Sequence, residues 1–165
     1  MMKNDNNEYK KYLDEGIWDF QRGDCKSAIE KITKSIELKN DWEIPYFYRA
    51  AAYHSLENFD EAMLDYSKAI LLNEKMTDAY YNRAKIILSR KDIENPDINA
   101  AVKDLEKALA LDEKFLDALF AIAAAHKKLG NYQTALEYLD KLIELEPDAI
   151  NARALKKLLL QKYIV

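Results

Sequence analysis

The sequence contains one cysteine, three glycines and three prolines among its 165 residues. A single cysteine, Cys25, excludes a framework of internal disulfides. Because so few glycines and prolines interrupt the chain, long helices are favoured over a β structure, which needs many turns. Three glycines are also too few to build a glycine-rich loop that cradles a phosphate. The composition therefore predicts a mainly helical chain without such a loop.

The chain also lacks a basic charge excess and a long apolar run. Its net charge of −4 argues against a nucleic-acid partner, which is normally met by a basic surface. The longest apolar run, which includes Leu119 to Ala125, falls far short of the roughly 20 residues that span a bilayer. The opening residues MMKNDNNEYK contain no apolar segment of the kind found in secretory signals. We therefore expect no membrane insertion and a cytoplasmic location.

Groups that could carry out chemistry are scarce. His54 and His126 lie far apart in the sequence, without other His or Cys residues at metal-ligand spacing beside them. The acidic residues are spread along the chain with lysines four residues away, as in Glu30 and Lys34, which is typical of a solvated helix surface. We therefore predict no catalytic residue, no metal, no cofactor and no enzymatic activity.

Four segments of the chain share one apolar pattern: CKSAIEKITKSI, FDEAMLDYSKAI, INAAVKDLEKAL and YQTALEYLDKLI. Apolar residues recur at offsets 0, 3, 4, 7, 10 and 11, which is one stripe of an amphipathic α-helix. Each segment has alanine three residues after its start, at Ala28, Ala62, Ala101 and Ala135. The pattern predicts four helices of the same design, beginning at Cys25, Phe59, Ile98 and Tyr132.

An earlier helix accompanies each of these segments and is marked by a small residue. This residue precedes the alanine by twelve positions in three units and by seventeen in the third, so the third unit has a five-residue insertion near Pro96. We expect the insertion to form a longer loop or to extend the preceding helix, with Pro96 in the first turn of the next helix. The small residues of the four first helices are Gly16, Ala50, Ala84 and Ala123. Such residues let two antiparallel helices approach closely.

The turns inside the units use residues that end one helix and begin another. Glycine adopts the left-handed conformation that ends a helix, and Asp or Asn caps the next one. The turns are Gly23-Asp24, Glu57-Asn58 and Gly130-Asn131. The sequence therefore predicts helix pairs that recur with a period of 34 residues, as shown by Tyr46 and Tyr80.

These features resemble the tetratricopeptide repeat family. The family pattern falls on Tyr46, Ala50, Ala62, Tyr66 and Ala69 in the second unit, with Glu74 where proline is common; the fourth unit matches it at Leu119, Ala123, Ala135, Leu139 and Pro147. The resemblance implies an all-α, right-handed α-solenoid of antiparallel helix pairs with about nine helices. It divides the chain into repeats 9–42, 43–76, 77–115 (with the insertion) and 116–149, followed by a capping helix, 150–165.

The resemblance also implies a concave groove lined by the first helix of each pair. Aromatic side chains are expected in register along it, with lysines at one side, and such rings suit peptide recognition. Alternatively, the aromatics only pack between neighbouring helices. The candidate groove residues are Leu13, Ile17, Phe47, His54, Tyr81, Asn82, Lys85, Phe120 and Lys127.

We predict a module that binds a peptide or helical segment of another protein, apolar with some acidic residues, as an adaptor or scaffold. The family members that bind chaperone C-termini use a two-carboxylate clamp of Lys, Asn and Arg. Those cations are absent here, which argues against that subfamily. The corresponding residues are Leu13, Ile17, Tyr48, Asp78 and Asn82.

Three further possibilities remain open. The chain is similar in build to repeat-containing secretion or assembly chaperones, which would hold a partner segment in the same groove. Its apolar end, LLLQKYIV, could instead join two copies into a homo-oligomer. In the first unit, Glu15 stands where the second unit has Arg49; Trp18 and Phe20 lie nearby and form either a contact surface or a tolerant end unit.

Overall fold

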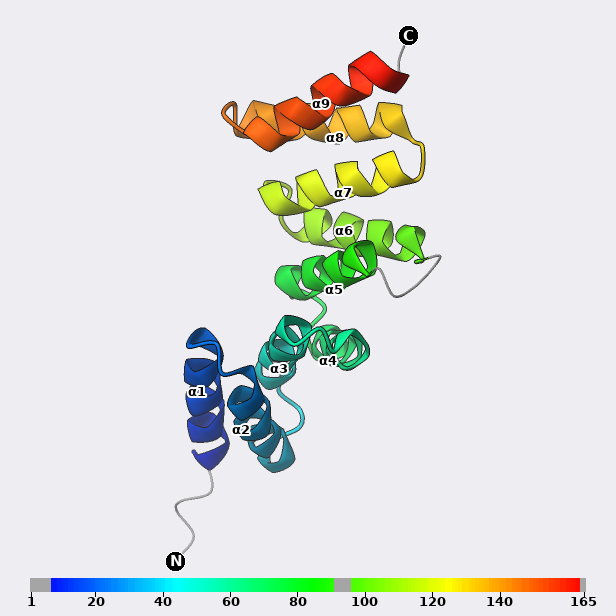
Figure 1. Ribbon diagram of the computed structural model, residues 1–165. Coiled ribbons are helices and arrows are strands. Elements are labelled where there is room, and N and C mark those ends of the chain that lie inside the picture. The colour runs from blue at the N-terminus through cyan, green and yellow to red at the C-terminus, as the bar shows by residue number, and fades with distance from the viewer. Residues whose placement is uncertain (1–6, 91–95, 164–165) are drawn as a thin grey trace, which may run out of the picture. The chain divides into compact units, whose positions relative to one another are not determined.

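The computed structural model describes residues 7–90 and 96–163, and within these ranges the chain forms nine helices and no strand (Figure 1). This confirms the predicted all-α class. The helices are α1 (Glu8–Gln21), α2 (Cys25–Leu38), α3 (Glu43–Ser55), α4 (Phe59–Leu72), α5 (Thr77–Ser89), α6 (Ile98–Leu111), α7 (Leu116–Lys128), α8 (Tyr132–Leu145) and α9 (Ile150–Tyr163).

The chain divides into two compact units, Met1–Ala79 and Tyr80–Val165. In the first unit α1 packs on α2, α2 on α3 and α3 on α4. In the second unit α6 packs on α7, α7 on α8 and α8 on α9, and these helices form successive layers in Figure 1. The helices that pack on each other in these two sets run antiparallel and are joined by short loops. Within each unit the predicted stacking of helix pairs is therefore present.

The second helix of each pair begins at the residue that the apolar pattern predicts. Each of these four helices, α2, α4, α6 and α8, is 14 residues long. Asp24 and Asp97 cap α2 and α6 by accepting hydrogen bonds at 3.1 Å from the backbone N–H groups of Ser27 and Ala100. The predicted side-chain cap is therefore confirmed at Asp24, and Asp97 is a cap that the sequence analysis did not name. Asn58 and Asn131 occupy the N-cap positions of α4 and α8 but make no side-chain bond to the helix.

The turns inside the pairs adopt the left-handed backbone conformation. Gly23 and Gly130 have φ values of 84° and 80°, as their sequence positions predict. In the second pair Glu57 takes this conformation at φ 60°, which costs about 1 kcal/mol for a residue with a side chain. The turn geometry is therefore common to the three pairs although the residue that adopts it differs.

The insertion in the third repeat does not lengthen α5, which is 13 residues long, like α3 and α7. It falls between Ser89 and Ile98, where residues 91–95 lie outside the described part of the chain. Pro96 precedes the capping residue Asp97 and lies outside α6. The prediction that this proline occupies the first turn of the helix was therefore wrong.

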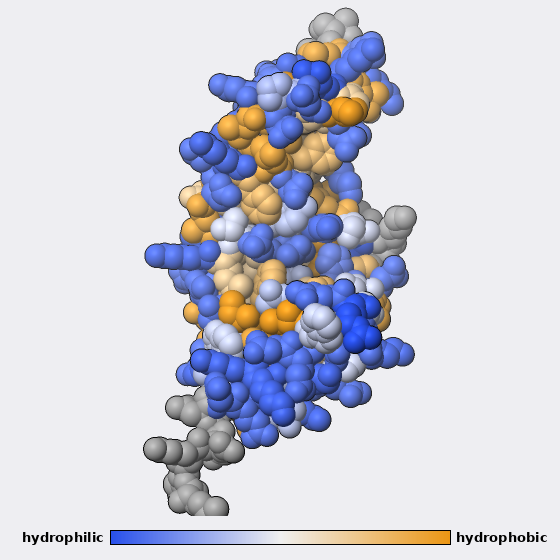
Figure 2. Space-filling model, turned by 90° about the vertical axis from the view of Figure 1, so that its left-hand side faces the viewer, coloured by the Kyte–Doolittle hydropathy of each residue, from blue (hydrophilic) through white to orange (hydrophobic). Residues whose placement is uncertain are grey.

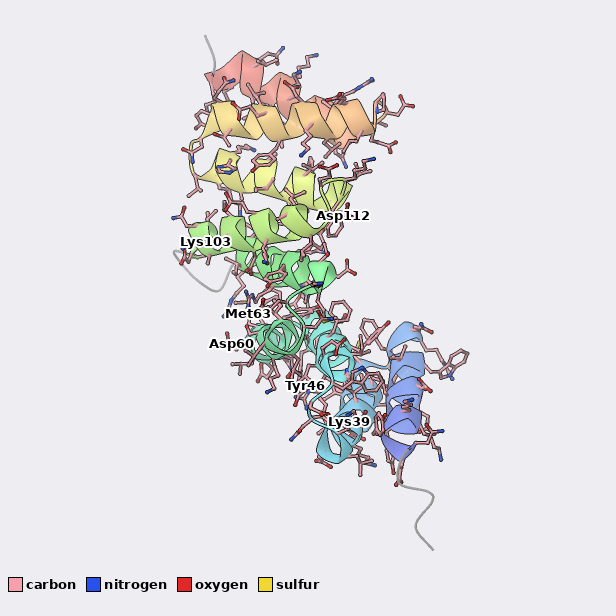
Figure 3. All side chains as sticks on the ribbon, turned by 180° about the vertical axis from the view of Figure 1, so that it is seen from behind. Lys39, Tyr46, Asp60, Met63, Lys103 and Asp112 are labelled. Carbon is pink, nitrogen blue, oxygen red and sulfur yellow. The ribbon has the colours of Figure 1, made fainter. Side chains whose placement is uncertain are left out.

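The connection between α2 and α3 is closed by a tyrosine of the second repeat. Figure 3 labels Lys39, which follows α2, and Tyr46, which lies on α3. The Tyr46 hydroxyl donates a hydrogen bond to the Asn40 carbonyl at 3.2 Å, and the Lys39 ammonium lies 2.7 Å from the Asp41 carboxylate. The Tyr46 bond holds the loop against α3, and the Lys39–Asp41 pair lies within the loop.

Close packing of the paired helices depends on the small residues. Ala28, Ala50, Ala62 and Ala123 are all fully buried. A Cβ added to Gly16 would lie only 2.5 Å from Ile32 Cγ1, so the helix contact leaves no room for even a methyl group. The predicted close approach is confirmed, and it fixes each first helix against its partner.

Helix α9 repeats the register of a first helix but departs from it at one position. Lys157 follows Ala123 by 34 residues and is exposed, whereas Ala152 and Leu159 are buried. A lysine at this point would prevent another helix from packing as closely as α2 packs on α1 at Gly16. Helix α9 therefore packs on α8 with one face and leaves Lys157 exposed, and its role as a capping helix stays a prediction.

Because Tyr66 is buried, we expect the free energy of unfolding to fall as the pH rises above 10. Burial, supported by the Asp78 carboxylate, raises the pKa of Tyr66 above its ordinary value near 10. Above pH 10 the unfolded tyrosine therefore loses its proton while the folded one keeps it, so unfolding becomes easier by up to about 1.4 kcal/mol per pH unit. We expect Tyr66→Phe to unfold in urea with a flatter dependence on pH between 10 and 12 than the wild type.

The control for this experiment is Tyr163→Phe, because Tyr163 is 37 % exposed. The control keeps Tyr66, so its stability should fall with rising pH as in the wild type. An equal slope for Tyr66→Phe and Tyr163→Phe would contradict the assignment to Tyr66.

Candidate functional site

Two buried ion pairs fix the first helices of the central repeats. Arg49 on α3 donates from Nε and Nη2 to the two oxygens of Asp65 on α4, at 2.6 and 2.8 Å. Arg83 on α5 makes the same pair of bonds to Asp104 on α6, at 2.8 and 2.7 Å. Asp65 and Asp104 are only 7 % and 8 % exposed, so the prediction that the acidic residues lie on solvated surfaces was wrong for these two.

The outer repeats connect their helices differently at the same positions. In the first, Lys31 on α2 stands where Asp65 lies in the second, and its ammonium is 2.6 Å from the Asp19 carboxylate on α1. This hydrogen bond holds the pKa of Asp19 below its ordinary value, with help from Ser27. In the fourth repeat the corresponding residues are Ile122, which is buried, and Tyr138, which stacks on His126 at 5.7 Å.

The first unit presents partly buried aromatic rings over a buried cluster. Leu13 is 2 % exposed and belongs to this cluster, and Ile17, Phe20, Phe47 and Tyr48 pack against it. Leu13 therefore supports the surface from beneath, while the other side chains stay partly accessible.

Rings of this unit contact one another, edge to face around Phe47 and in a tilted arrangement at His54. The Phe47 ring lies 5.5 Å from Tyr48 and 5.7 Å from Tyr66, and His54 lies 6.0 Å from Phe59. Packing between helices and exposure at the surface thus occur together in these side chains.

The second unit brings Tyr81, Asn82 and Lys85 onto α5 and Phe120 and Lys127 onto α7. The Tyr81 ring lies 4.9 Å from Phe115, and burial raises the pKa of Tyr81, with a further contribution from the Asp117 carboxylate. Lys85 Nζ lies 5.9 Å from the centre of the Tyr81 ring. All of these side chains except the exposed Lys85 are half-buried.

A cavity of about 430 Å³ opens where α7 begins, α8 ends and α9 begins. In Figure 2 the ends of these helices face the viewer in the upper part of the molecule, where apolar residues in orange lie among hydrophilic residues in blue. Of the predicted groove residues only Phe120 lines the cavity. The lining residues are Leu116, Asp117, Phe120, Leu142, Glu146, Asp148, Ala149, Ile150, Asn151 and Ala152.

Several of these lining residues were missed from the sequence. Glu146 and Asp148 belong to the connection from α8 to α9, and Ile150 begins α9, whereas the family pattern assigns the groove to the first helices of the repeats. The signal available in the sequence was the recurrence of a first-helix register at residue 150, which places this connection beside the start of α7.

Other candidate surfaces lie at the ends of the described chain. Trp18 is 59 % exposed, although Ala52, Ile86 and Ala125 at the same repeat position are fully buried. On α9, Leu158 and Leu160 are 43 % and 44 % exposed. Self-association through α9 stays a prediction.

No three His, Cys, Asp or Glu side chains within residues 7–90 and 96–163 are grouped so that they could hold a metal ion. Over the same residues, none of the helices combines the length and the apolar content that a membrane span requires.

Two family models match the chain. Residues 116–164 match the Fis1 C-terminal tetratricopeptide repeat, and residues 46–76 match a tetratricopeptide repeat. Sperm-associated antigen 1 of Homo sapiens is 35% identical over 97 residues, which is 59% of this chain and 10% of that protein. The chain spans between a tenth and about a quarter of the length of the curated relatives it matches.

Solved structures share the fold. MamA (residues 41 to the end) from Desulfovibrio magneticus RS-1 has a TM-score of 0.84 at 17% identity, covering 98% of this chain and 86% of that one. The first repeat domain of Spaghetti (RPAP3), solved with the HSP90 peptide SRMEEVD, has a TM-score of 0.70 at 24% identity, covering 79% of this chain and 99% of that one. At these identities the likeness concerns the fold alone.

Proposed function

Because this chain belongs to the tetratricopeptide repeat family, we propose that it is a non-enzymatic module that binds a peptide or helical segment of another protein. Proteins of this family act as protein-interaction modules, and the repeat domain of Spaghetti was solved with a bound peptide. In this proposal the chain works as an adaptor or scaffold. The observation that carries it is the set of partly exposed aromatic rings on the first helices of each unit.

The rings suit this role because they are held rigidly. Phe47 packs between Tyr48 and Tyr66, and Tyr81 packs on Phe115, so binding would cost little side-chain entropy. Their supporting helices are fixed by the ion pairs of Arg49 and Arg83. A surface of anchored aromatic side chains with charged residues beside it has the composition of the central part of protein interfaces.

The partner proposed here is not a chaperone tail of the kind that a carboxylate clamp holds. In the first unit the clamp positions carry Leu13, Ile17 and Tyr48, and Leu13 is buried. Without cations at these positions, a pair of terminal carboxylates would lose its water without gaining ionic hydrogen bonds. The partner segment should therefore bind mainly through its apolar side chains.

Two double variants test this proposal, one for each unit: Ile17→Ala/Phe47→Ala and Tyr81→Ala/Phe120→Ala. Because truncating a central aromatic anchor costs about 1.4 kcal/mol or more, we expect at least about tenfold less partner captured from native lysate by the variant of the unit that binds. The measurement is quantitative affinity capture with the full chain, with thermal unfolding by circular dichroism to confirm that each variant is folded.

The matched control is Leu64→Ala/Leu71→Ala on α4, whose side chains are 72 % and 73 % exposed but lie on a second helix. This control should capture partners like the wild type. Equal capture by all four proteins would exclude the first-helix surfaces as the binding site.

A further inference from the structure

The cavity at the ends of α7, α8 and α9 has an apolar lining that a protein side chain could fill. Leu116, Phe120, Leu142 and Ile150 contribute to it, and Ile150 is 79 % exposed at its edge. A volume of about 430 Å³ lies within the range of sites that take small ligands or a few side chains. An occupant that covers Ile150 would remove its apolar side chain from water, which is favourable.

The charged residues of this cavity all have one sign. Asp117, Glu146 and Asp148 line it, and none of its ten lining residues is a lysine, arginine or histidine. The ion pairs found among the described residues involve other carboxylates, such as Asp65 and Asp104. The cavity thus combines an apolar lining with carboxylates that have no cationic partner in the described part of the chain.

Helix electrostatics account for only part of this charge. Asp117 lies in the first turn of α7, where the helix dipole favours an acidic side chain. Glu146 is the C-cap of α8 and stands at the negative end of that helix, where an acidic side chain is disfavoured. Folding of α8 therefore gives no reason for Glu146, whereas a positively charged occupant would.

The opposite end of α7 has the opposite charge. Its last turn carries Lys127 and Lys128, and the Lys128 ammonium donates a hydrogen bond to the Leu88 carbonyl on α5 at 2.7 Å. Over its 13 residues α7 is about 18 Å long, so acidic and basic groups are separated by a distance that five or six extended residues span. The acidic cavity and the lysines can thus be contacted by different parts of one bound segment.

We propose that this cavity binds a partner segment that carries a lysine or arginine next to a large apolar side chain. The apolar side chain enters between Phe120, Leu142 and Ile150, and the cation lies against Glu146, Asp148 and Asp117. This assignment rests on the proposed binding function and adds to it the chemistry of one end of the partner. It differs from the acidic partner that the lysines suggest from the sequence, because it concerns the other end of α7.

Labelled synthetic peptides test the proposal with the full chain. Three 12-residue peptides share a Leu-Phe-Leu centre and differ in their flanks, which are Lys-Arg, Gln-Gln or Glu-Asp. By fluorescence anisotropy at low salt we expect the basic peptide to bind at least about fivefold more tightly than the neutral one, and the acidic peptide to bind most weakly. The double variant Glu146→Lys/Asp148→Lys should reverse this order.

The matched control is Glu137→Lys/Glu144→Lys, which makes the same charge change at exposed positions of α8 that do not line the cavity. It should keep the wild-type order of the three peptides. All variants change exposed side chains, and circular dichroism checks that they fold.

The outcomes separate this inference from the proposed function. If the order of the peptides is the same in the wild type and in Glu146→Lys/Asp148→Lys, the inference fails. The proposed function still stands in that case if Tyr81→Ala/Phe120→Ala captures less partner from lysate. If sedimentation shows a dimer that the Glu146→Lys/Asp148→Lys variant loses, the occupant is a second copy of this chain and the inference also fails.

Discussion

Replacing Asp65 with alanine is expected to lower the free energy of unfolding by about 3 kcal/mol. The change leaves the Arg49 guanidinium without its two hydrogen bonds to the carboxylate, and only its bond to Thr33 at 3.0 Å remains. Breaking a buried pair by removing one partner typically costs about 3–5 kcal/mol, and the 17 % exposure of the Arg49 side chain places this pair at the lower end. Urea unfolding followed by circular dichroism measures the effect.

The fourth repeat supplies the control for this prediction. It has Ile122 and Tyr138 where the second has Arg49 and Asp65, and no ion pair is needed there. Transferring these residues in the double variant Arg49→Ile/Asp65→Tyr removes both charges, so we expect a loss of less than about 1.5 kcal/mol. A double variant as unstable as Asp65→Ala would show that the volume of the side chains, and not the unpaired charge, determines the cost.

The helix starts could be predicted from the sequence because a helix that is buried on one side repeats its apolar residues every three or four positions. That rule placed Cys25, Phe59, Ile98 and Tyr132 correctly at the starts of the second helices. The family resemblance, which depends on the same repeated pattern, is confirmed by the two matching tetratricopeptide repeat models. Periodicity does not show how deeply a side chain is buried. Leu13, which was predicted to line the groove, therefore turns out to lie in the core.

The buried charges were harder to predict than the apolar residues. The residues that surround Asp65 and Asp104 in the sequence are typical of a solvent-exposed helix. Each aspartate nevertheless forms an ion pair with an arginine on the preceding helix. Asp65 follows its arginine by 16 residues and Asp104 follows its arginine by 21. The two separations differ because the five-residue insertion lies between Arg83 and Asp104. Only an alignment of the repeats that allows for the insertion shows the same ion pair twice.

The candidate site was predictable only in part, because the family pattern describes positions on regular helices. Phe120 was expected on the groove surface, and it lines the cavity beside α9. Glu146 and Ile150 lie beside it only because α8 ends and α9 begins at this place. Such groups depend on how a loop turns at the end of the array, which no repeat period encodes.

Replacing Ala123 with lysine is expected to lower the free energy of unfolding by more than about 4 kcal/mol. Ala123 is fully buried in the cluster that contains Leu119, Ala135 and Leu139. A lysine there would separate α7 from α8 and place an unpaired charge among aliphatic side chains, which costs several kcal/mol beyond the strain of overpacking. Thermal and urea unfolding would show an early transition or an unfolded chain.

Helix α9 provides the matched position, because Lys157 stands 34 residues after Ala123 and is exposed. Lys157→Ala should therefore change the stability by no more than about 0.5 kcal/mol. The variant Ala123→Leu separates volume from charge, and overpacking alone should cost about 1–3 kcal/mol. If Ala123→Lys unfolded like the wild type, the helices of this pair would not be held by close contact at the small residues, and the rigid support of the first-helix surface would be lost with it.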